Sequence, residues 1–287
     1  MKTLGAILLS SRPLSWVNTA FPFAAAYFLS TRDLDATFWI GTLYFLVPYN
    51  LAMYGINDVF DYESDLRNPR KGGVEGAVLD RSLHRPILIA VVVSNVPFLG
   101  YLVAVGSALS WVVLAISIFA VIAYSAAGLR FKEIPFLDSV TSSTHFVSPA
   151  VYGLALAGAS FADAGLLAIL GSFFLWGMGS HAFGAVQDVL ADREGGIRSI
   201  ATEIGARATV RFAVLAYLLA GLLLTLTSWP GPLASVLAVP YILNALPFWR
   251  ITDDTAESAN RGWKHFLALN FVSGFCVTML LIWSVLA

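Results

Sequence analysis

The sequence has 287 residues, of which 58% are hydrophobic and only 12% are charged, and its mean hydropathy is +0.76. Soluble domains carry about 25% charged residues, so this composition excludes an ordinary soluble protein and indicates a protein of the lipid bilayer. The net charge of -1 says little about partners because the charges are unevenly placed, and no nucleic-acid partner is expected. The single cysteine, Cys276, excludes a disulfide framework.

Apolar stretches long enough to cross about 30 Å of hydrocarbon recur along the chain. Lipid admits only helices and closed barrels, and these stretches lack the alternation of barrel strands. We therefore predict an all-α integral membrane protein with nine transmembrane helices. In chain order they cover roughly residues 13–30, 37–57, 86–105, 108–127, 136–158, 163–186, 207–228, 231–249 and 264–286.

The basic residues predict the orientation of these helices. With nine spans, 16 of the 17 Lys and Arg residues fall on the side of the N-terminus, and only Arg32 falls on the other. The positive-inside rule then places the N-terminus and the long connections 58–85 and 187–206 in the cytoplasm. We expect a multi-pass protein of the cell membrane whose active site faces the cytoplasm.

Two acidic segments echo one another. "NDVFDYESD" at 57–65 and "QDVLADREGG" at 187–196 both begin with an amide, then Asp and Val, and both follow an apolar stretch. They are four predicted helices apart, which places them on the same membrane side. We therefore predict one domain, residues 1–287, with a pseudo-repeat of two four-helix halves (about 13–127 and 136–249) and a ninth helix.

The spacing of the acids predicts a metal site. On a helix with about 100° per residue, Asp58, Asp61 and Asp65 fall within about 60° of one another, and Asn57 adjoins them. Asp188 and Asp192 are one turn apart. Adjacent carboxylates at a membrane edge are costly unless cations offset them, and Mg²⁺ binds through carboxylates and substrate phosphate oxygens. The alternative, ordinary charged helix ends paired with nearby arginines, does not account for the echo.

These residues resemble a known family. The first segment reads N-D-x-x-D-x-x-x-D, the second D-x-x-x-D, and "YSAAGLRFKEIPFLD" (124–138) lies between them. In order and spacing they resemble the UbiA superfamily of intramembrane prenyltransferases over essentially the whole chain. The resemblance implies nine helices around a central cavity that opens to lipid. It implies Mg²⁺ ligands at Asn57, Asp58, Asp61, Asp65, Asp188 and Asp192, of which the five aspartates are catalytic.

The resemblance also implies a prenyl diphosphate as donor. Contacts to its diphosphate are expected from Tyr124, Lys132 and Arg198 by the family pattern, and from Arg67, Arg70 and Lys71, which follow the first motif. "NDVFDYESDLRNPRKGG" is most similar to bacterial lycopene elongases of fifty-carbon carotenoid synthesis. That subgroup implies dimethylallyl diphosphate as donor, lycopene as acceptor, and partner enzymes of the carotenoid pathway. One departure is that the Arg-Pro of the family comes late here, at Arg85–Pro86.

Other interpretations stay open at this point. An aromatic acceptor, as in quinone, haem or chlorophyll pathways, fits the same motifs. An ion-coupled transporter would also use intramembrane acids, but its acids should lie near the bilayer midplane rather than at one face. His181 and His145 either line the cavity or, as is more common, form hydrogen bonds between helices.

Overall fold

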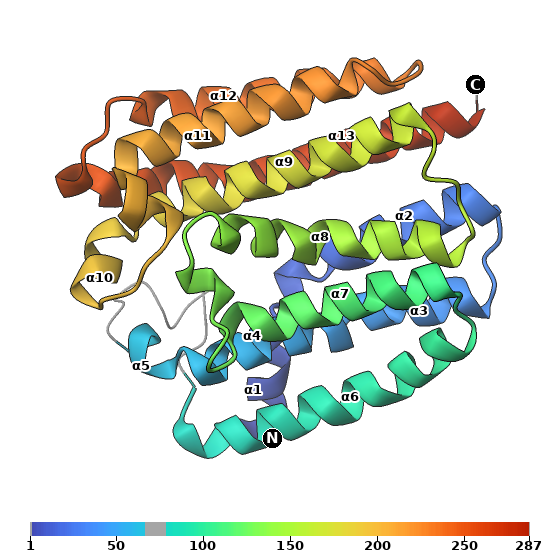
Figure 1. Ribbon diagram of the computed structural model, residues 1–287, viewed down its shortest axis with the longest axis horizontal. Coiled ribbons are helices and arrows are strands. Elements are labelled where there is room, and N and C mark those ends of the chain that lie inside the picture. Colours follow the sequence, from blue (N-terminus) through green and yellow to red (C-terminus); the bar gives the residue numbers. More distant parts are fainter. Residues whose placement is uncertain (1, 67–78, 287) are drawn as a thin grey trace. The chain divides into compact units, whose positions relative to one another are not determined.

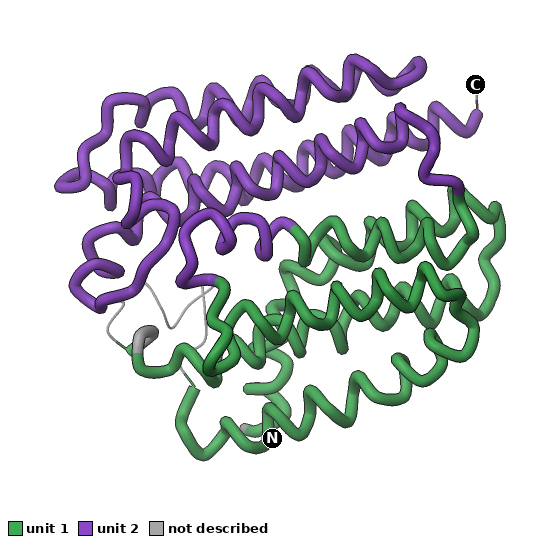
Figure 2. The backbone as a smooth tube through the Cα atoms, in the orientation of Figure 1, with its two compact units in different colours: residues 1–131, 144–159 green, residues 132–143, 160–287 purple. Residues whose placement is uncertain are grey.

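The computed structural model describes residues 2–66 and 79–286, and every regular element in this part of the chain is a helix (Figure 1). The chain forms two compact units (Figure 2). Unit 1 comprises residues 1–131 and 144–159, and unit 2 comprises residues 132–143 and 160–287. The division falls within helix α8 (Leu137–Leu156). The predicted repeat of halves 13–127 and 136–249 stays a prediction.

Unit 1 contains the first seven α-helices and the C-terminal part of α8. These helices are α1 (Lys2–Ser10), α2 (Val17–Thr31), α3 (Ala36–Leu46), α4 (Pro48–Phe60), α5 (Tyr62–Asp65), α6 (His84–Ala104) and α7 (Ala108–Ser125). Short 3-10 turns lie at Pro13–Ser15, Arg81–Leu83 and Phe131–Glu133. Helix α4 packs against α1, α3, α6 and α7, so it is the central helix of this unit.

Unit 2 contains the N-terminal part of α8 and five further α-helices. These are α9 (Ala164–Val186), α10 (Val189–Glu194), α11 (Ile200–Leu224), α12 (Ala238–Ala245) and α13 (Asn260–Leu286). The 3-10 segments η4 (Gly231–Leu237), η5 (Leu246–Phe248) and η6 (Asp253–Ala259) extend or connect them. Helix α11 packs along α9 and α12, and α12 packs on α13 (Figure 1).

Each unit has its own core. In unit 1 the rings of Phe23, Phe45 and Tyr152 gather, with centroids 5.2 Å apart for Phe23–Phe45 and 5.9 Å for Phe45–Tyr152. In unit 2 the core includes Phe183 and Tyr217. Large apolar side chains also cover the outside of the helices, including Val93, Phe119, Leu222 and Phe271. An apolar exterior of this kind is stable in lipid and would aggregate in water.

Six helical segments of the described chain are long and apolar enough to cross a membrane, which confirms a multi-pass membrane protein. They are residues 81–104, 108–125, 164–186, 200–224, 231–248 and 253–286. The three other predicted spans are not among these six segments, and each has a local reason. Helix α2 has only 15 residues. Span 37–57 is divided into α3 and α4 because Pro48, which lacks an N–H, starts a new helix after Val47. Helix α8 is continuous over 20 residues, but its many Ser and Thr residues make it less apolar than the six segments.

Candidate active site

The first acidic motif lies where α4 ends, inside unit 1. Asp58 and Asp61 are almost fully buried, with 1% and 3% of their surface exposed. The side-chain amide of Asn57 donates to Asp61 Oδ2 at 2.5 Å and to Ser125 Oγ at 2.9 Å, which connects the end of α4 to the end of α7. The predicted grouping of Asn57 with Asp61 is therefore present, and an amide orients the carboxylate.

Asp58 is held by residues from the N-terminal segment. Its Oδ1 accepts from Arg12 Nη2 at 2.6 Å, and its Oδ2 accepts from Ser10 Oγ at 2.7 Å. The Arg12 guanidinium also lies over the Tyr54 ring, 5.3 Å from its centroid. A buried carboxylate needs such a partner, because an unpaired charge in an apolar interior is strongly destabilising. Arg12 was counted above only among the basic residues that set the orientation, although an arginine within the apolar N-terminal run was a signal for a buried partner.

Asp61 lies near a second arginine. Arg130 Nη2 is 3.6 Å from Asp61 Oδ1, and Arg130 Nη1 is 3.5 Å from the carbonyl oxygen of Phe60. Arg130 belongs to the segment 124–138, in which sequence reasoning selected Tyr124 and Lys132 instead. The two buried aspartates thus lie beside two arginines from distant parts of the chain.

The helix that carries the first motif is broken at Asp61. Helix α4 ends at Phe60, and α5 resumes at Tyr62 and ends at Asp65. The single helix assumed for Asp58, Asp61 and Asp65 is therefore divided at Asp61, and the place of Asp65 in the acidic group stays a prediction. Glu63 pairs with Arg81 on the surface. Arg67, Arg70 and Lys71 lie outside the described residues.

The second motif lies in unit 2, where α10 begins. The Asp192 amide donates to the Asp188 carbonyl oxygen at 2.8 Å, so the two residues are one turn apart as predicted. Both side chains are half-buried and thus more accessible than Asp58 and Asp61. Gln187, the echo of Asn57, has a different role, because its Oε1 accepts from Asn260 Nδ2 at 2.6 Å. The echo is therefore partial at the level of contacts.

The other expected site residues have identifiable surroundings within their own units. In unit 1, the rings of Tyr124 and His145 meet edge to face with centroids 5.2 Å apart. In unit 2, Arg198 pairs with Glu203 at 3.1 Å on an exposed surface. Lys132 lies in the 3-10 turn before α8 and is partly exposed.

His181 belongs to a buried polar network in unit 2. Its Nδ1 is 3.1 Å from Ser139 Oγ, and Ser139 Oγ donates to Asp138 Oδ1 at 3.3 Å. Asp138, which is fully buried, also accepts from the Ile200 amide at 2.7 Å. Which of Ser139 Oγ and His181 Nδ1 donates in their contact depends on the tautomer of the imidazole. Asp138 is the last residue of the segment 124–138, and it was not among the predicted site residues.

The oxygen atoms of the two acidic motifs are the kind of ligand that a hard divalent cation takes. Among the described residues, no three His, Cys, Asp or Glu side chains gather closely enough to form a metal site. The acids of the two motifs offer oxygen atoms only, and oxygen is the ligand type that Mg²⁺ takes, usually from one or two carboxylates together with substrate phosphate. Arg12 and Ser10 each engage one Asp58 oxygen, so this carboxylate would have to exchange a partner to bind a metal.

A protein-family model matches most of the chain. The model described as the UbiA prenyltransferase family matches residues 19–273. The chain therefore belongs to the UbiA prenyltransferase family, and the predicted prenyltransferase, an enzyme rather than a transporter, is confirmed.

Particular relatives are closer still. The chain is 55% identical over 282 residues to the lycopene elongase/hydratase of Corynebacterium glutamicum (strain ATCC 13032), and the match covers 98% of each chain. It is 59% identical over 278 residues to the C(50) beta-cyclic carotenoids biosynthesis protein LbtBC of Dietzia sp. (strain CQ4). That match covers 96% of this chain but only 64% of the Dietzia protein, so the chain spans less than two thirds of that relative.

A solved structure shares the fold. The UbiA homologue from Archaeoglobus fulgidus, bound to DMAPP and Mg²⁺, matches with a TM-score of 0.68 at 18% identity. The match covers 93% of this chain and 98% of the other. At this identity the likeness establishes the helical fold alone.

Proposed function

We propose that this chain catalyses the magnesium-dependent transfer of a dimethylallyl group from dimethylallyl diphosphate to lycopene. The observation that carries the proposal is the 55% identity to a lycopene elongase/hydratase over 98% of both chains. The donor and the metal are supported by the Archaeoglobus homologue, whose structure is bound to DMAPP and Mg²⁺.

In this proposal the acids of both motifs hold the metal. The ligands are Asn57, Asp58, Asp61, Asp65, Asp188 and Asp192. When bound, Mg²⁺ supplies Lewis-acid stabilisation for the charge that develops on the leaving diphosphate. The carboxylates of Asp188 and Asp192 are partly exposed and can receive the cation directly, whereas Asn57 orients Asp61 through its 2.5 Å hydrogen bond.

Basic and polar residues bind the diphosphate in the same proposal. They are Arg67, Arg70, Lys71, Tyr124, Lys132 and Arg198, as the sequence predicted. Arg130 is added to this group because its guanidinium already lies beside the Asp61 carboxylate. The guanidinium can move when the charge at that carboxylate changes. Fixed cations around a departing anion lower the barrier by electrostatic stabilisation, and no protein nucleophile is needed.

The allylic cation left behind must meet the acceptor before it meets water. Asp58 and Asp61 are almost fully buried, so water is scarce around them, and exclusion of water protects a reactive cation. An electron-rich alkene carbon of lycopene then forms the new bond, and the product cation loses a proton or takes up water. His181 and His145 are the candidate cavity residues, and the imidazole of His181 is the group that would accept the proton.

The topology belongs to the proposal as well. Nine spans around a central cavity, a cytoplasmic N-terminus, a cytoplasmic active site in the cell membrane, and cooperation with carotenoid-pathway enzymes are supported by the charge bias and the family. A cysteine placed in the connection 187–206, in a variant that lacks Cys276, should react with an impermeant thiol reagent only from the cytoplasmic side.

The test uses purified protein in lipid nanodiscs with Mg²⁺ and labelled dimethylallyl diphosphate. With lycopene as acceptor, label is expected in a longer carotenoid. 4-Hydroxybenzoate and a naphthoate are offered in parallel. Labelling of an aromatic acid while lycopene stays unmodified would overturn the acceptor but leave prenyl transfer in place. The absence of transfer to every acceptor, with folded protein, would contradict the whole proposal.

A further inference from the structure

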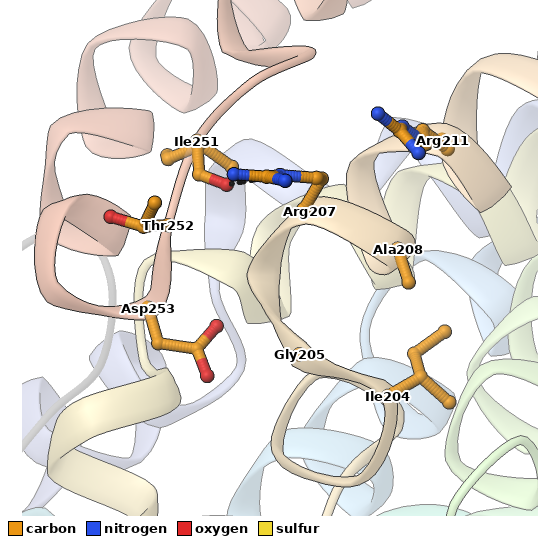
Figure 3. A pocket seen from close by; sticks show the side chains of 8 residues that line it. All are labelled: Ile204, Gly205, Arg207, Ala208, Arg211, Ile251, Thr252 and Asp253. Atoms are coloured by element: carbon orange, nitrogen blue, oxygen red, sulfur yellow. Dashed lines mark hydrogen bonds between the residues drawn. The ribbon is translucent and has the colours of Figure 1, made fainter.

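A basic depression lies in unit 2, and none of the aspartates of the two motifs lines it. Its volume is about 540 Å³, and its lining includes Gly205, Arg207, Arg211, Ile251, Thr252 and Asp253 (Figure 3). We refer to it as the Arg207–Arg211 pocket. Both arginine side chains are exposed, so a ligand from outside the protein can reach them.

Gly205 creates the pocket. Its φ of 80° and ψ of 158° interrupt α11, and side-chain-bearing residues rarely adopt this conformation. The helix resumes at Ala206, whose amide donates to Asp253 Oδ1 at 2.7 Å. Arg207 and Arg211 are therefore four residues apart on the resumed helix and lie on one face, where like charges repel.

Among the described residues, neither Arg207 nor Arg211 forms an ion pair with a carboxylate. Asp253 lines the same pocket, but its carboxylate is bonded elsewhere. Its Oδ2 accepts from Arg193 Nη1 at 2.6 Å, and its Oδ1 accepts from the Ala206 amide. Arg207 Nε makes a long hydrogen bond of 3.4 Å to the Ile251 carbonyl oxygen. Arg211 lies over the Trp249 ring at 5.1 Å. Two guanidinium groups thus share one depression, with their charge available to an anion.

The position of the pocket favours a lipid as the source of that anion. Two apolar segments that can cross the membrane, residues 200–224 and 231–248, have ends next to it. Trp249 is 38% exposed, and tryptophan at the end of a span is typical of the interface between hydrocarbon and headgroups. Basic pockets between helices at this depth bind anionic headgroups, and arginine pairs with phosphate through two parallel hydrogen bonds.

We propose that the Arg207–Arg211 pocket binds the phosphate of an anionic phospholipid headgroup. The guanidinium groups of Arg207 and Arg211 contact the phosphate oxygens, and Trp249 faces the adjoining acyl region. The bound phosphate would offset the repulsion between the two arginines. Because Arg193 of α10 bonds to Asp253 at the rim of the pocket, an occupied pocket would also stabilise the start of α11 against α10.

The experiment measures lipid retention directly. Purified protein is exchanged into phosphatidylcholine nanodiscs with or without phosphatidylglycerol, and bound lipid is counted by native mass spectrometry. Each arginine near an anionic headgroup contributes about a fivefold increase in affinity, so the double variant Arg207→Gln/Arg211→Gln should retain phosphatidylglycerol about 30-fold more weakly. Arg261→Gln is the matched control, because Arg261 is also exposed at the start of a helix but does not line the pocket.

Two further measurements separate loss of lipid binding from loss of folding, and a lipid from a soluble anion. Ala208→Glu leaves both arginines in place and puts a carboxylate three residues before Arg211 on the exposed face, so it should also release phosphatidylglycerol, even if the double variant does not fold. Inorganic phosphate and diphosphate are added as soluble competitors. Unchanged phosphatidylglycerol retention in either pocket variant, or equal loss in Arg261→Gln, would overturn the proposal. Displacement by millimolar phosphate would assign the pocket to a soluble anion instead of a lipid.

Discussion

The carboxylate of Asp138 accepts a hydrogen bond from the backbone amide of Ile200 at 2.7 Å, across 62 residues of sequence. Its other oxygen accepts from the Ser139 amide at 2.6 Å. Ile200 is the first residue of α11, where backbone amides have no partner within the helix and a negative charge is favourable. Asp138 therefore anchors the end of the connection that carries Asp188 and Asp192.

The first prediction concerns this anchor. Asp138→Asn replaces one acceptor oxygen with an NH₂ group, which must then face a backbone N–H in a fully buried site. We expect a loss of about 1–3 kcal/mol in the free energy of unfolding, because a buried donor is left without an acceptor. Thermal unfolding in detergent measures it. Asp163→Asn is the control, since Asp163 caps α9 at an exposed position where water can replace it. Equal losses in both variants would contradict the role of burial.

The second prediction concerns Arg12 and Asp58. Arg12→Gln removes the cation from a carboxylate whose side chain is fully buried. Removing one partner of a buried ion pair costs about 3–5 kcal/mol, because the buried carboxylate loses the cation beside it. The double variant Arg12→Met/Asp58→Asn should recover most of this loss, since it leaves no buried charge. Thermal unfolding of the three proteins decides, and an Arg12→Gln variant as stable as the parent chain would refute the assignment.

The third prediction rests on the proposed metal site. Asp61→Asn and Asp188→Asn each remove one oxygen ligand, so we expect prenyl transfer to fall by at least about 100-fold and to require more Mg²⁺. Transfer is measured across a Mg²⁺ titration, with EDTA as the metal-free reference. Glu63→Gln is the matched control, because Glu63 lies on the same segment but pairs with Arg81 at the surface. Full activity in either aspartate variant would remove that residue from the site.

The fourth prediction compares two glycines in helices. A Cβ on Gly205 would lie 3.3 Å from Asp253 Oδ1, and its φ of 80° is unfavourable for any side chain. Gly205→Ala should therefore destabilise the protein by about 1–3 kcal/mol. A Cβ on Gly100 in α6 would meet nothing within 4 Å. Gly100→Ala should instead stabilise by about 0.5–1 kcal/mol, because alanine loses less entropy in a helix. Unfolding temperatures that shift in the same direction would be the contrary result.

Some differences between expectation and structure had visible local causes. The break between α3 and α4 follows from Pro48, which was present in the sequence but read as part of a continuous span. The end of α4 at Phe60 has no comparable signal, because Asp61 has a φ of -101° and a ψ of 2° without any glycine or proline nearby. That geometry accompanies its contacts with Asn57 and Arg130 and was not predictable from the segment alone.

The sequence by itself determined the membrane class, the spacing of the two acidic motifs and the helix starts at Ser107 and Asp163, whereas α11 begins at Ile200, before the predicted span 207–228. These features depend on neighbours within a few residues, through apolar run length and capping side chains. Only the tertiary structure decided which charges meet. Arg12 reaches Asp58 across 46 residues, and Asp138 reaches Ile200 across 62. Such pairs form because a buried charge is stable only next to a hydrogen-bonding or charged partner. The packing of the helices decides which partner lies near.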